Sequence, residues 1–226
     1  MNLIEYPDQD MMMIDVANHL AGELNEHLMV NDAASFAVPG GTTPGPIFDV
    51  LCAADLEWDK VQVLLTDERW VPESSELSNT RLVRQRLLVN RAATASFMPY
   101  YREGATPAGR IDGLTVALAP HLPISVLLLG MGADMHTASL FPGAEGLDRA
   151  LSGDGGSFYP IEMPGGGAGS QRITLTAPVL DGAMSKHLVI TGAQKREALE
   201  RAQGIGDPML APICAVLGGA TVHWAE

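Results

Sequence analysis

Apolar residues recur along this chain in two patterns, a helical spacing and short uninterrupted runs. Between residues 11 and 29 they return every four positions (Met12, Val16, Leu20, Leu24, Leu28), which predicts an amphipathic helix. Short apolar runs bounded by turn residues predict strands at 35–38, 61–65, 124–129, 187–191 and 220–224. Helical patterns between these runs predict a helix through residue 51 and helices over 79–88, 177–184 and 193–203.

This alternation of strands and helices predicts an α/β fold built on a mostly parallel sheet. The 226 residues fit one domain of this class, so we expect a single domain over residues 1–226. In such sheets, ligands bind beyond the carboxyl ends of the strands. The segments 40–43, 67–69, 130–136 and 192–195 follow predicted strands, and we expect them to meet in one site.

One segment departs from the alternation. Seven of the seventeen residues from Gly153 to Gly169 are glycine, a composition typical of a flexible surface connection. The alternative is a functional lid over the site, because the segment leads directly into Arg172.

The chain is strongly acidic, with 14 Lys and Arg against 27 Asp and Glu and a net charge of −13. Such a charge repels nucleic acid and anionic membranes, so we expect neither as a partner. It also repels a phosphorylated substrate at long range. Any anion site must therefore be built locally, from a few basic side chains and backbone N–H groups.

Several features favour a cytoplasmic location. No apolar run approaches the roughly 20 residues that span a bilayer. The first residues, MNLIEYPDQD, are acidic and lack the basic-then-apolar order of a signal peptide. Cys52 and Cys214 lie in no metal-like spacing and predict buried, reduced thiols.

The turn Gly40-Gly41-Thr42-Thr43-Pro44 has the parts of a phosphate cradle. Glycines let the backbone approach an anion, the threonines add hydroxyl donors, and Pro44 suits the start of a helix. A plain strand-to-helix turn has a similar composition, so both interpretations stay open.

The charged run Asp67-Glu68-Arg69 comes at the end of a predicted strand. It is either a solvated edge or part of the site. In the second case the planar guanidinium of Arg69 binds a carboxylate or phosphate oxygen. The acidic pair then fixes that arginine or the hydroxyls of a sugar.

Residues 130–137 carry the strongest local signal. A buried strand leads into a glycine turn, then Asp134 and His136, then what resembles the start of a short helix. Histidine is the usual general base near neutral pH, and a neighbouring carboxylate orients it. The alternative is a structural role for His136 in the turn. The other five histidines have no such neighbouring carboxylate at a strand end. His19 and His27 are expected on the surface of the first helix.

Other chemistries lack their motifs. There is no His-Glu-x-x-His and no Cys/His cluster, so no metal is expected. Gly-x-Ser-x-Gly and Gly-x-Gly-x-x-Gly are also missing, which disfavours a serine hydrolase and a dinucleotide cofactor.

Taken together, five blocks of the chain resemble the 6-phosphogluconolactonases. In order, they are VPGGTTP (38–44), LTDERWVP (65–72), SN (78–79), LGMGADMHTASLFP (129–142) and RITLT (172–176). The resemblance implies the fold of the glucosamine-6-phosphate deaminase group, a Rossmann-like, mostly parallel sheet flanked by helices. It implies hydrolysis of 6-phospho-D-glucono-1,5-lactone to 6-phospho-D-gluconate in the oxidative pentose phosphate pathway, without metal or cofactor. The partner is then a small sugar-phosphate lactone, and the chain a monomer or small homo-oligomer.

The resemblance also implies roles for single residues. His136 is the catalytic base that activates water, and Asp134 lies beside it. The residues expected to bind the substrate and its phosphate are Gly40, Gly41, Thr42, Thr43, Asp67, Arg69, Arg172 and Lys195. Backbone N–H groups near 130–132, or Arg69, are expected to stabilise the oxyanion. Arg172 as a strand cap and Lys195 as a solvated helix residue stay open as alternatives.

One residue departs from the family pattern, which usually has glycine between the aspartate and the histidine. Met135 occupies that position here. If the position is left-handed, Met135 is strained; otherwise the turn differs slightly.

Two other functions fit parts of the pattern. An amino-sugar-phosphate isomerase or deaminase of the same fold also uses an Asp-x-His region and an acidic residue at position 67, but blocks 67–72 and 172–176 favour the lactonase. A non-catalytic sugar-phosphate sensor is disfavoured because Asp134 and His136 are both present.

Overall fold

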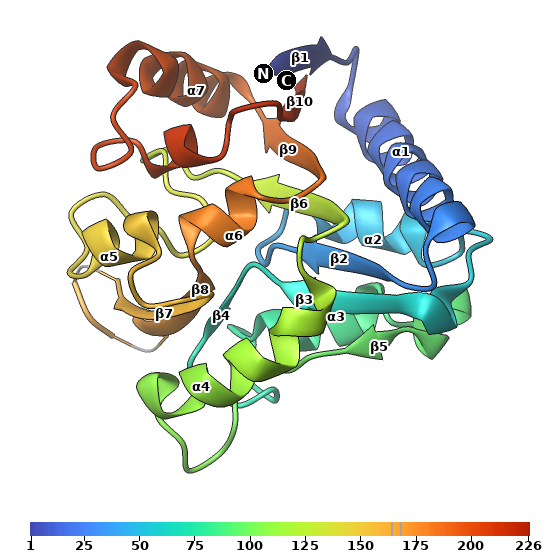
Figure 1. Ribbon diagram of the computed structural model, residues 1–226. Helices are drawn as coiled ribbons and strands as arrows, with labels where there is room; N and C mark the ends of the chain where they lie inside the picture. The colour runs from blue at the N-terminus through green and yellow to red at the C-terminus, as the bar shows by residue number, and fades with distance from the viewer. Residues whose placement is uncertain (164, 168) are drawn as a thin grey trace.

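A parallel sheet forms the centre of the molecule (Figure 1). The structure is a computed structural model that describes residues 1–163, 165–167 and 169–226. The strands of this sheet are β1 Asn2–Glu5, β2 Ala34–Val38, β3 Val61–Leu65, β5 Ser96–Phe97, β6 Val126–Gly130, β9 Ser185–Thr191 and β10 Thr221–Ala225. They lie in the order β1-β10-β9-β6-β2-β3-β5, and the pairs between them are parallel. The predicted α/β fold with a mostly parallel sheet is confirmed.

Helices cover this sheet. Their bounds are α1 Gln9–Val30, α2 Gly45–Leu51, α3 Asn79–Arg86, α4 Pro107–Leu118, α5 Leu147–Ser152, α6 Ala177–Asp181 and α7 Ala193–Ile205. The long helix α1 packs on α2 and on strands β2 and β10. The five apolar residues that predicted α1 are all buried, and the Asp8 carboxylate caps its first turn by accepting from Met11 N at 2.7 Å.

Three more strands form a separate antiparallel sheet in the order β4-β8-β7. They are β4 Asp67–Arg69, β7 Phe158–Glu162 and β8 Gln171–Leu175. The backbone of Thr66 joins the two sheets, since its N–H donates to Val38 O and its carbonyl accepts from Leu175 N, both at 2.9 Å. The small sheet therefore lies beside the carboxyl ends of β2 and β3.

Two sequence-based predictions need correction here. The segment 153–169 is not a plain surface connection, because β7 occupies its middle and pairs with β8; residues 164 and 168 lie outside the described structure. The helix predicted over 177–184 ends at Asp181, where Gly182 N–H bonds to Pro178 O and closes the last turn.

The central strands carry the core. Strand β2 is buried at all five positions, and β6 at four of five. This is the burial expected for parallel strands covered on both faces. The chain begins and ends at one edge of the sheet, where β1 pairs with β10 (Figure 1). No helix among the described residues is long and apolar enough to cross a membrane.

Two histidines outside the expected site form a pair that the sequence did not predict. His187 on β9 and His223 on β10 are buried, with His187 Nδ1 2.9 Å from His223 Nε2. Glu23 of α1 lies 2.8 Å from His187 Nε2, and Tyr6 OH lies 2.9 Å from His223 Nδ1. These partners come from segments far apart in sequence, so a linear pattern could not reveal them.

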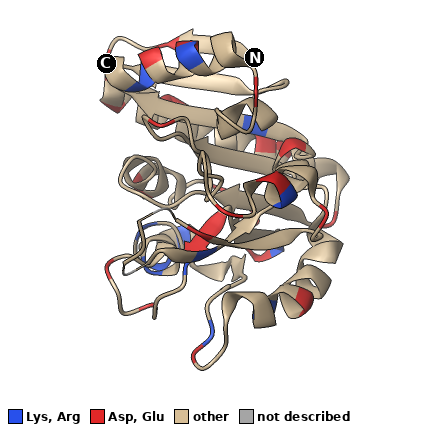
Figure 2. Ribbon diagram, turned by 90° about the vertical axis from the view of Figure 1, so that its left-hand side faces the viewer, with Lys and Arg blue, Asp and Glu red and all other residues tan. Residues whose placement is uncertain are grey.

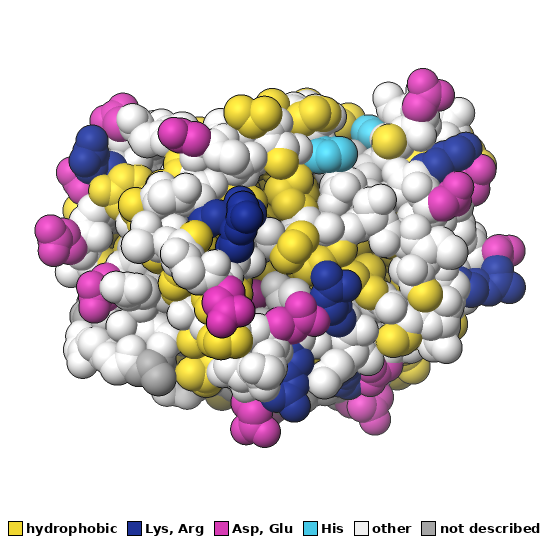
Figure 3. Space-filling view, turned by 90° about the horizontal axis from the view of Figure 1, so that it is seen from below, with side chains coloured by type: hydrophobic (Ala, Val, Ile, Leu, Met, Phe, Trp, Pro, Cys, Tyr) yellow, Lys and Arg dark blue, Asp and Glu magenta, His cyan; other side chains and the backbone are white. Residues whose placement is uncertain are grey.

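Charged residues are spread along the chain rather than collected in one element (Figure 2). On the face seen in Figure 3, basic side chains lie among acidic and hydrophobic ones. A protein with a net charge of −13 and this mixed surface presents no broad basic footprint for a polyanion on the face shown.

Candidate active site

A cavity of about 220 Å³ opens at the carboxyl ends of β2 and β6, next to β4 and β8. It is lined by nine of the ten residues predicted for the site: Gly40, Gly41, Thr42, Thr43, Asp67, Arg69, His136, Arg172 and Lys195. The tenth, Asp134, does not line the cavity but is hydrogen-bonded to His136. The structure thus brings all the predicted site residues to one place.

The glycine turn after β2 forms one wall. A Cβ atom on Gly40 would lie 1.8 Å from Asn79 Oδ1, so only glycine fits there. Gly41 has φ +90°, a conformation that favours glycine. The turn leads through Pro44 into α2, as expected from a strand-to-helix connection. Its backbone and the hydroxyls of Thr42 and Thr43 border the cavity.

The turn after β6 presents His136. Gly132 N–H donates to His136 O at 3.0 Å, and Met135 N–H donates to Gly132 O at 2.9 Å, which closes a tight loop. A Cβ atom on Gly132 would lie 2.3 Å from the His136 ring, so the loop requires glycine at this point. Gly132 N–H is bonded within the loop, which removes it from the backbone donors near 130–132 that were expected for an oxyanion.

Asp134 fixes the imidazole. Its Oδ1 lies 2.5 Å from His136 Nδ1. The hydrogen bond from His136, more than its charge, lowers the pKa of Asp134 against the opposing effect of burial. The carboxylate is therefore ionised near neutral pH and favours the tautomer with a proton on Nδ1. Nε2 is left as the basic nitrogen, and the side chain is 31% exposed.

Met135 stands in the left-handed region with φ +68°. The Asp-x-His turn thus keeps the backbone form suited to glycine, although this chain has methionine. The left-handed form costs roughly 1–2 kcal/mol for a residue with a Cβ. The side chain packs against the main core, which offsets part of that cost.

The short helix expected after His136 is not formed. Thr137 and Leu140 instead make an antiparallel bridge, and Ala138 has φ +49°, which is incompatible with a helix. Thr137 Oγ1 donates to Gly130 O at 2.9 Å and ties the turn to the end of β6. The chain then reverses, so that Phe141 packs beside His136.

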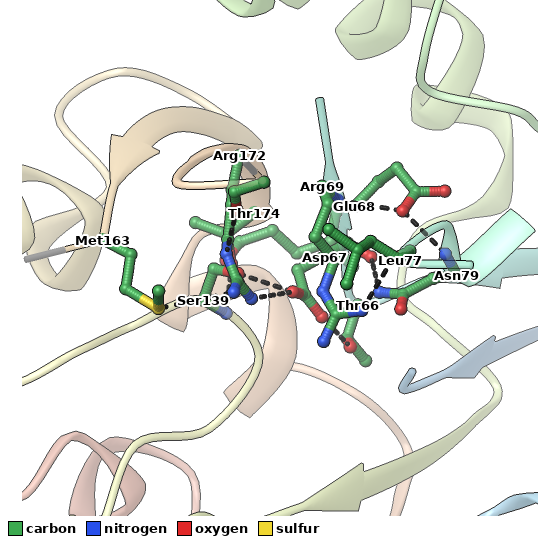
Figure 4. Close-up of polar contacts among 12 residues, drawn as sticks. Thr66, Asp67, Glu68, Arg69, Leu77, Asn79, Ser139, Met163, Arg172 and Thr174 are labelled. Carbon is green, nitrogen blue, oxygen red and sulfur yellow. Dashed lines mark hydrogen bonds and ion pairs between the residues drawn. The ribbon is translucent and has the colours of Figure 1, made fainter. Parts of the chain in front are cut away.

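Two arginines come together across the small sheet. In the β4–β8 pair, Arg69 lies directly opposite Arg172, and Asp67 opposite Thr174. In Figure 4 the Asp67 side chain points toward Ser139, whose Oγ donates to Asp67 Oδ2 at 2.5 Å. Arg172 Nη1 lies 3.8 Å from the same oxygen. Asp67 is thus buried as the partner of Ser139 and Arg172.

Each arginine is held by backbone acceptors. Arg69 Nη1 donates to Leu77 O at 2.7 Å, while its Nε is buried without a hydrogen-bond partner among the described residues. Arg172 Nε donates to Gly169 O at 3.1 Å, and Nη2 contacts Met163 Sδ at 3.4 Å. Burial lowers the pKa of Arg172, but a guanidinium stays charged in proteins.

Glu68 does not bind substrate or fix the Arg69 guanidinium. Its fully buried carboxylate accepts from the N–H groups of Asn79 and Thr80, each at 2.8 Å, and so caps α3. It also accepts from Arg69 N at 2.9 Å. Burial raises the pKa of Glu68. Of the predicted acidic pair, only Asp67 faces the cavity.

Lys195 lies in the first turn of α7, just after Gly192, and lines the cavity. Burial lowers its pKa. Within the described residues, no carboxylate forms an ion pair with it. Together with Arg69 and Arg172, it makes the cavity locally basic in an acidic protein.

Asn79 and Ser139 also belong to the site, although neither was among the residues predicted for it. Asn79 lines the cavity, and its Nδ2 donates to Asp67 O at 2.8 Å. Ser139 links Asp67 to Arg172. Both lie inside the family blocks, which was the only signal that could have found them. No group of three or more His, Cys, Asp or Glu side chains in the described part of the chain is arranged to hold a metal ion.

Comparison with known proteins gives a consistent picture. Residues 7–224 match the family model described as glucosamine-6-phosphate isomerases/6-phosphogluconolactonase. A 6-phosphogluconolactonase of Rhizobium meliloti is 39% identical over 93% of this chain and 92% of its own length. One from Pseudomonas aeruginosa is also 39% identical, over 92% of this chain and 88% of its own length.

Solved structures agree. The crystal structure of a 6-phosphogluconolactonase from Shewanella baltica superposes with a TM-score of 0.94 at 30% identity, covering 100% of this chain and 97% of that one. A monomeric glucosamine-6-phosphate deaminase superposes with a TM-score of 0.83, covering 100% of this chain and 98% of that one. Its identity is only 13%, so this likeness shows the shared fold alone.

Proposed function

Since the chain belongs to the family of glucosamine-6-phosphate isomerases and 6-phosphogluconolactonases, we propose that it hydrolyses 6-phospho-D-glucono-1,5-lactone to 6-phospho-D-gluconate, with water activated by His136. The relatives at 39% identity are named 6-phosphogluconolactonase, and the match covers nearly their whole length. This favours the lactonase over the other activity of the family. This reaction is a step of the oxidative pentose phosphate pathway.

One observation carries the proposal: a carboxylate-oriented histidine and three cationic side chains share one cavity. His136 supplies the base: Asp134 engages its Nδ1, and Nε2 has no hydrogen-bond partner in the described part of the chain. Arg69, Arg172 and Lys195 supply positive charge at the same cavity. A phosphorylated ester needs both, an anion site to hold it and a base to activate water beside its carbonyl.

The reaction then proceeds in two steps. His136 Nε2 removes a proton from a water molecule as its oxygen attacks the lactone carbonyl carbon, and Asp134 stabilises the imidazolium that forms. The tetrahedral intermediate collapses by breaking the bond to the ring oxygen, which takes the proton back from His136. The products are the open-chain hydroxyl group and the carboxylic acid, which ionises.

The negative charge on the former carbonyl oxygen needs a donor in the intermediate. The guanidinium of Arg69 suits this role, because Arg69 lines the cavity and carries several N–H donors. A fixed cation next to the developing oxyanion stabilises it more strongly than water does, because it needs no reorganisation during the reaction.

The phosphate group is the anchor of the substrate in this proposal. Arg172 and Lys195, with the Gly40–Thr43 turn, offer charge and backbone N–H groups at short range. Asp67 holds Arg172 and is near enough to the cavity to accept from a sugar hydroxyl. Orientation through the phosphate is an effective source of rate enhancement for a lactone that also opens spontaneously.

We further propose that residues 1–226 act as a single domain in the cytoplasm, without a metal or cofactor, as a monomer or small homo-oligomer. The charge of −13 and the lack of a metal-ligand motif in the sequence support this view. The chemistry above uses only side chains of the chain and one water molecule.

The test is hydrolysis of the freshly made phosphorylated lactone, with the spontaneous rate subtracted. We expect a saturable enzymatic rate that is nearly lost in the His136→Ala variant. Glucosamine 6-phosphate serves as the comparison substrate. Release of ammonia from it, with no acceleration of lactone opening, would assign the chain to the family's other activity.

A further inference from the structure

The ring of Phe141 contacts two residues that line the cavity, His136 and Arg172. Its centroid lies 4.5 Å from that of the His136 imidazole, with an angle of 43° between the rings. The Cζ atom of Arg172 lies 5.1 Å from the same centroid. His136 follows β6 of the parallel sheet, whereas Arg172 belongs to β8 of the small sheet. One aromatic side chain therefore contacts both the base and a cation of the anion site.

Phe141 is itself firmly held. It is 6% exposed and packs with Ala144 and Ile161 in a small cluster separate from the main core, with Met163 against it. Met163 in turn contacts Arg172 through its sulfur. The bridge at Thr137 and Leu140 fixes the backbone that leads into Phe141. The ring is thus anchored independently of the two side chains that it touches.

These contacts limit the movement of the His136 imidazole and the Arg172 guanidinium. The hydrogen bond to Asp134 fixes one nitrogen of His136 but leaves the imidazole free to tilt about that bond. A ring packed against it removes much of this freedom, and an aromatic face attracts both an imidazolium and a guanidinium. We propose that Phe141 is a positioning residue for the lactonase: it sets the place of His136 Nε2 relative to Arg172. This inference rests on the proposed function.

Paired variants distinguish a positioning role of Phe141 from a merely structural one. Phe141→Met keeps an apolar side chain of similar length but removes the ring, whereas Phe141→Tyr keeps the ring. Phe158→Met is the matched control, because Phe158 is fully buried on β7 in the main core and its ring packs on Tyr100. We expect Phe141→Met to lower kcat about tenfold and raise KM about threefold, as misplacement of a base and a weakened cation contact require. Phe141→Tyr should keep most of kcat, and Phe158→Met should change thermal stability more than kcat.

A double-variant cycle tests the route of the effect. In the His136→Ala background, Phe141→Met should lower the residual rate no further, because the base through which it acts is gone. It should still weaken binding of the product 6-phosphogluconate, measured by calorimetry, through Arg172. An equal loss of rate in both backgrounds, or losses in Phe141→Met and Phe158→Met that follow only their stability, would overturn the proposal.

A measurement on the unaltered protein guards against a variant that does not fold. The Phe141 ring should shift the His136 imidazole proton resonances upfield in the NMR spectrum, with assignment from the His136→Ala spectrum. Unshifted His136 resonances would contradict the proposal. If the wild-type protein does not accelerate lactone opening at all, the proposed function fails instead, while the ring-current result still reports on the contact.

Discussion

Arg69 and Arg172 face each other directly across the antiparallel β4–β8 pair. Like charges at opposite positions of two strands destabilise a sheet, and the one carboxylate paired with them within the described residues is that of Asp67, 3.8 Å from Arg172 Nη1. An arrangement that is unfavourable for the free protein becomes favourable when an anion binds both cations. The pair supports the proposal that the cavity binds a dianionic group.

Removing one of these cations tests the anion site. Arg172→Ala should reduce catalytic efficiency on the phosphorylated lactone about ten- to a hundredfold, since a charge-assisted contact is worth roughly 1.5–3 kcal/mol. The variant should affect unphosphorylated gluconolactone much less, because that substrate has no phosphate group for Arg172 to bind. The measurement is the ratio of kcat/KM for the two lactones in wild type and variant. Equal efficiencies in the wild type would refute the anion-site interpretation.

The buried histidine pair predicts a pH dependence of stability. Burial, followed by the neighbouring His187, lowers the pKa of His223 from 6.5 to about 4. The unfolded chain therefore binds more protons between these values, and the contribution of His223 is fully present above about pH 6.5 and lost as the pH falls to 4. Its size is up to about 3 kcal/mol.

Urea unfolding of wild type and His223→Gln at several pH values checks this slope. The difference in unfolding free energy between the two proteins should shrink as the pH is lowered from 7 to 4. The exposed Met29, replaced by alanine, is the control and should leave the slope unchanged, because it carries no charge. A His223→Gln protein that loses stability in parallel with wild type would show that this histidine does not sense pH.

Met135 allows the strain of the Asp-x-His turn to be measured. Its φ of +68° disfavours any residue with a Cβ, so Met135→Gly should be more stable than Met135→Ala by about 1 kcal/mol. Comparing these two variants cancels the loss of the methionine packing that both share. Chemical denaturation gives the difference directly, and a more stable alanine variant would contradict the left-handed turn.

Chelators should leave the activity unchanged. The proposed steps need only His136, the cations of the cavity and water, and the described residues contain no metal-ligand cluster. Activity after prolonged dialysis against EDTA should equal that of the untreated protein. Loss of activity that zinc or magnesium restores would require a different mechanism.

The sequence predicted the parts of this protein that depend on local pattern. The periodic apolar residues of α1 and the apolar runs of β3 and β6 identify elements buried in the core, and their positions agree within a few residues. The residues at the strand ends met as expected, because parallel strands present their carboxyl ends to one edge. The family blocks added the roles that single motifs left open.

What escaped prediction depends on pairing between distant segments. The short strand β4 forms only because β8, about a hundred residues later, pairs with it, and three charged residues carry no strand signal alone. The role of Glu68 was hidden because its partners Asn79 and Thr80 begin α3, and nothing in the spacing of these residues showed that the loop between them folds back. The contact of Phe141 with His136 needed the chain reversal at Ala138, where a helix had been the simpler expectation.

The central claim is that His136 activates water in this cavity, and the turnover of His136→Ala on the phosphorylated lactone tests it most directly. With spontaneous opening subtracted and the fold checked by thermal unfolding, kcat should fall by about two to four orders of magnitude while product binding through the cations stays nearly unchanged. A variant that keeps near-wild-type kcat would remove His136 from the mechanism.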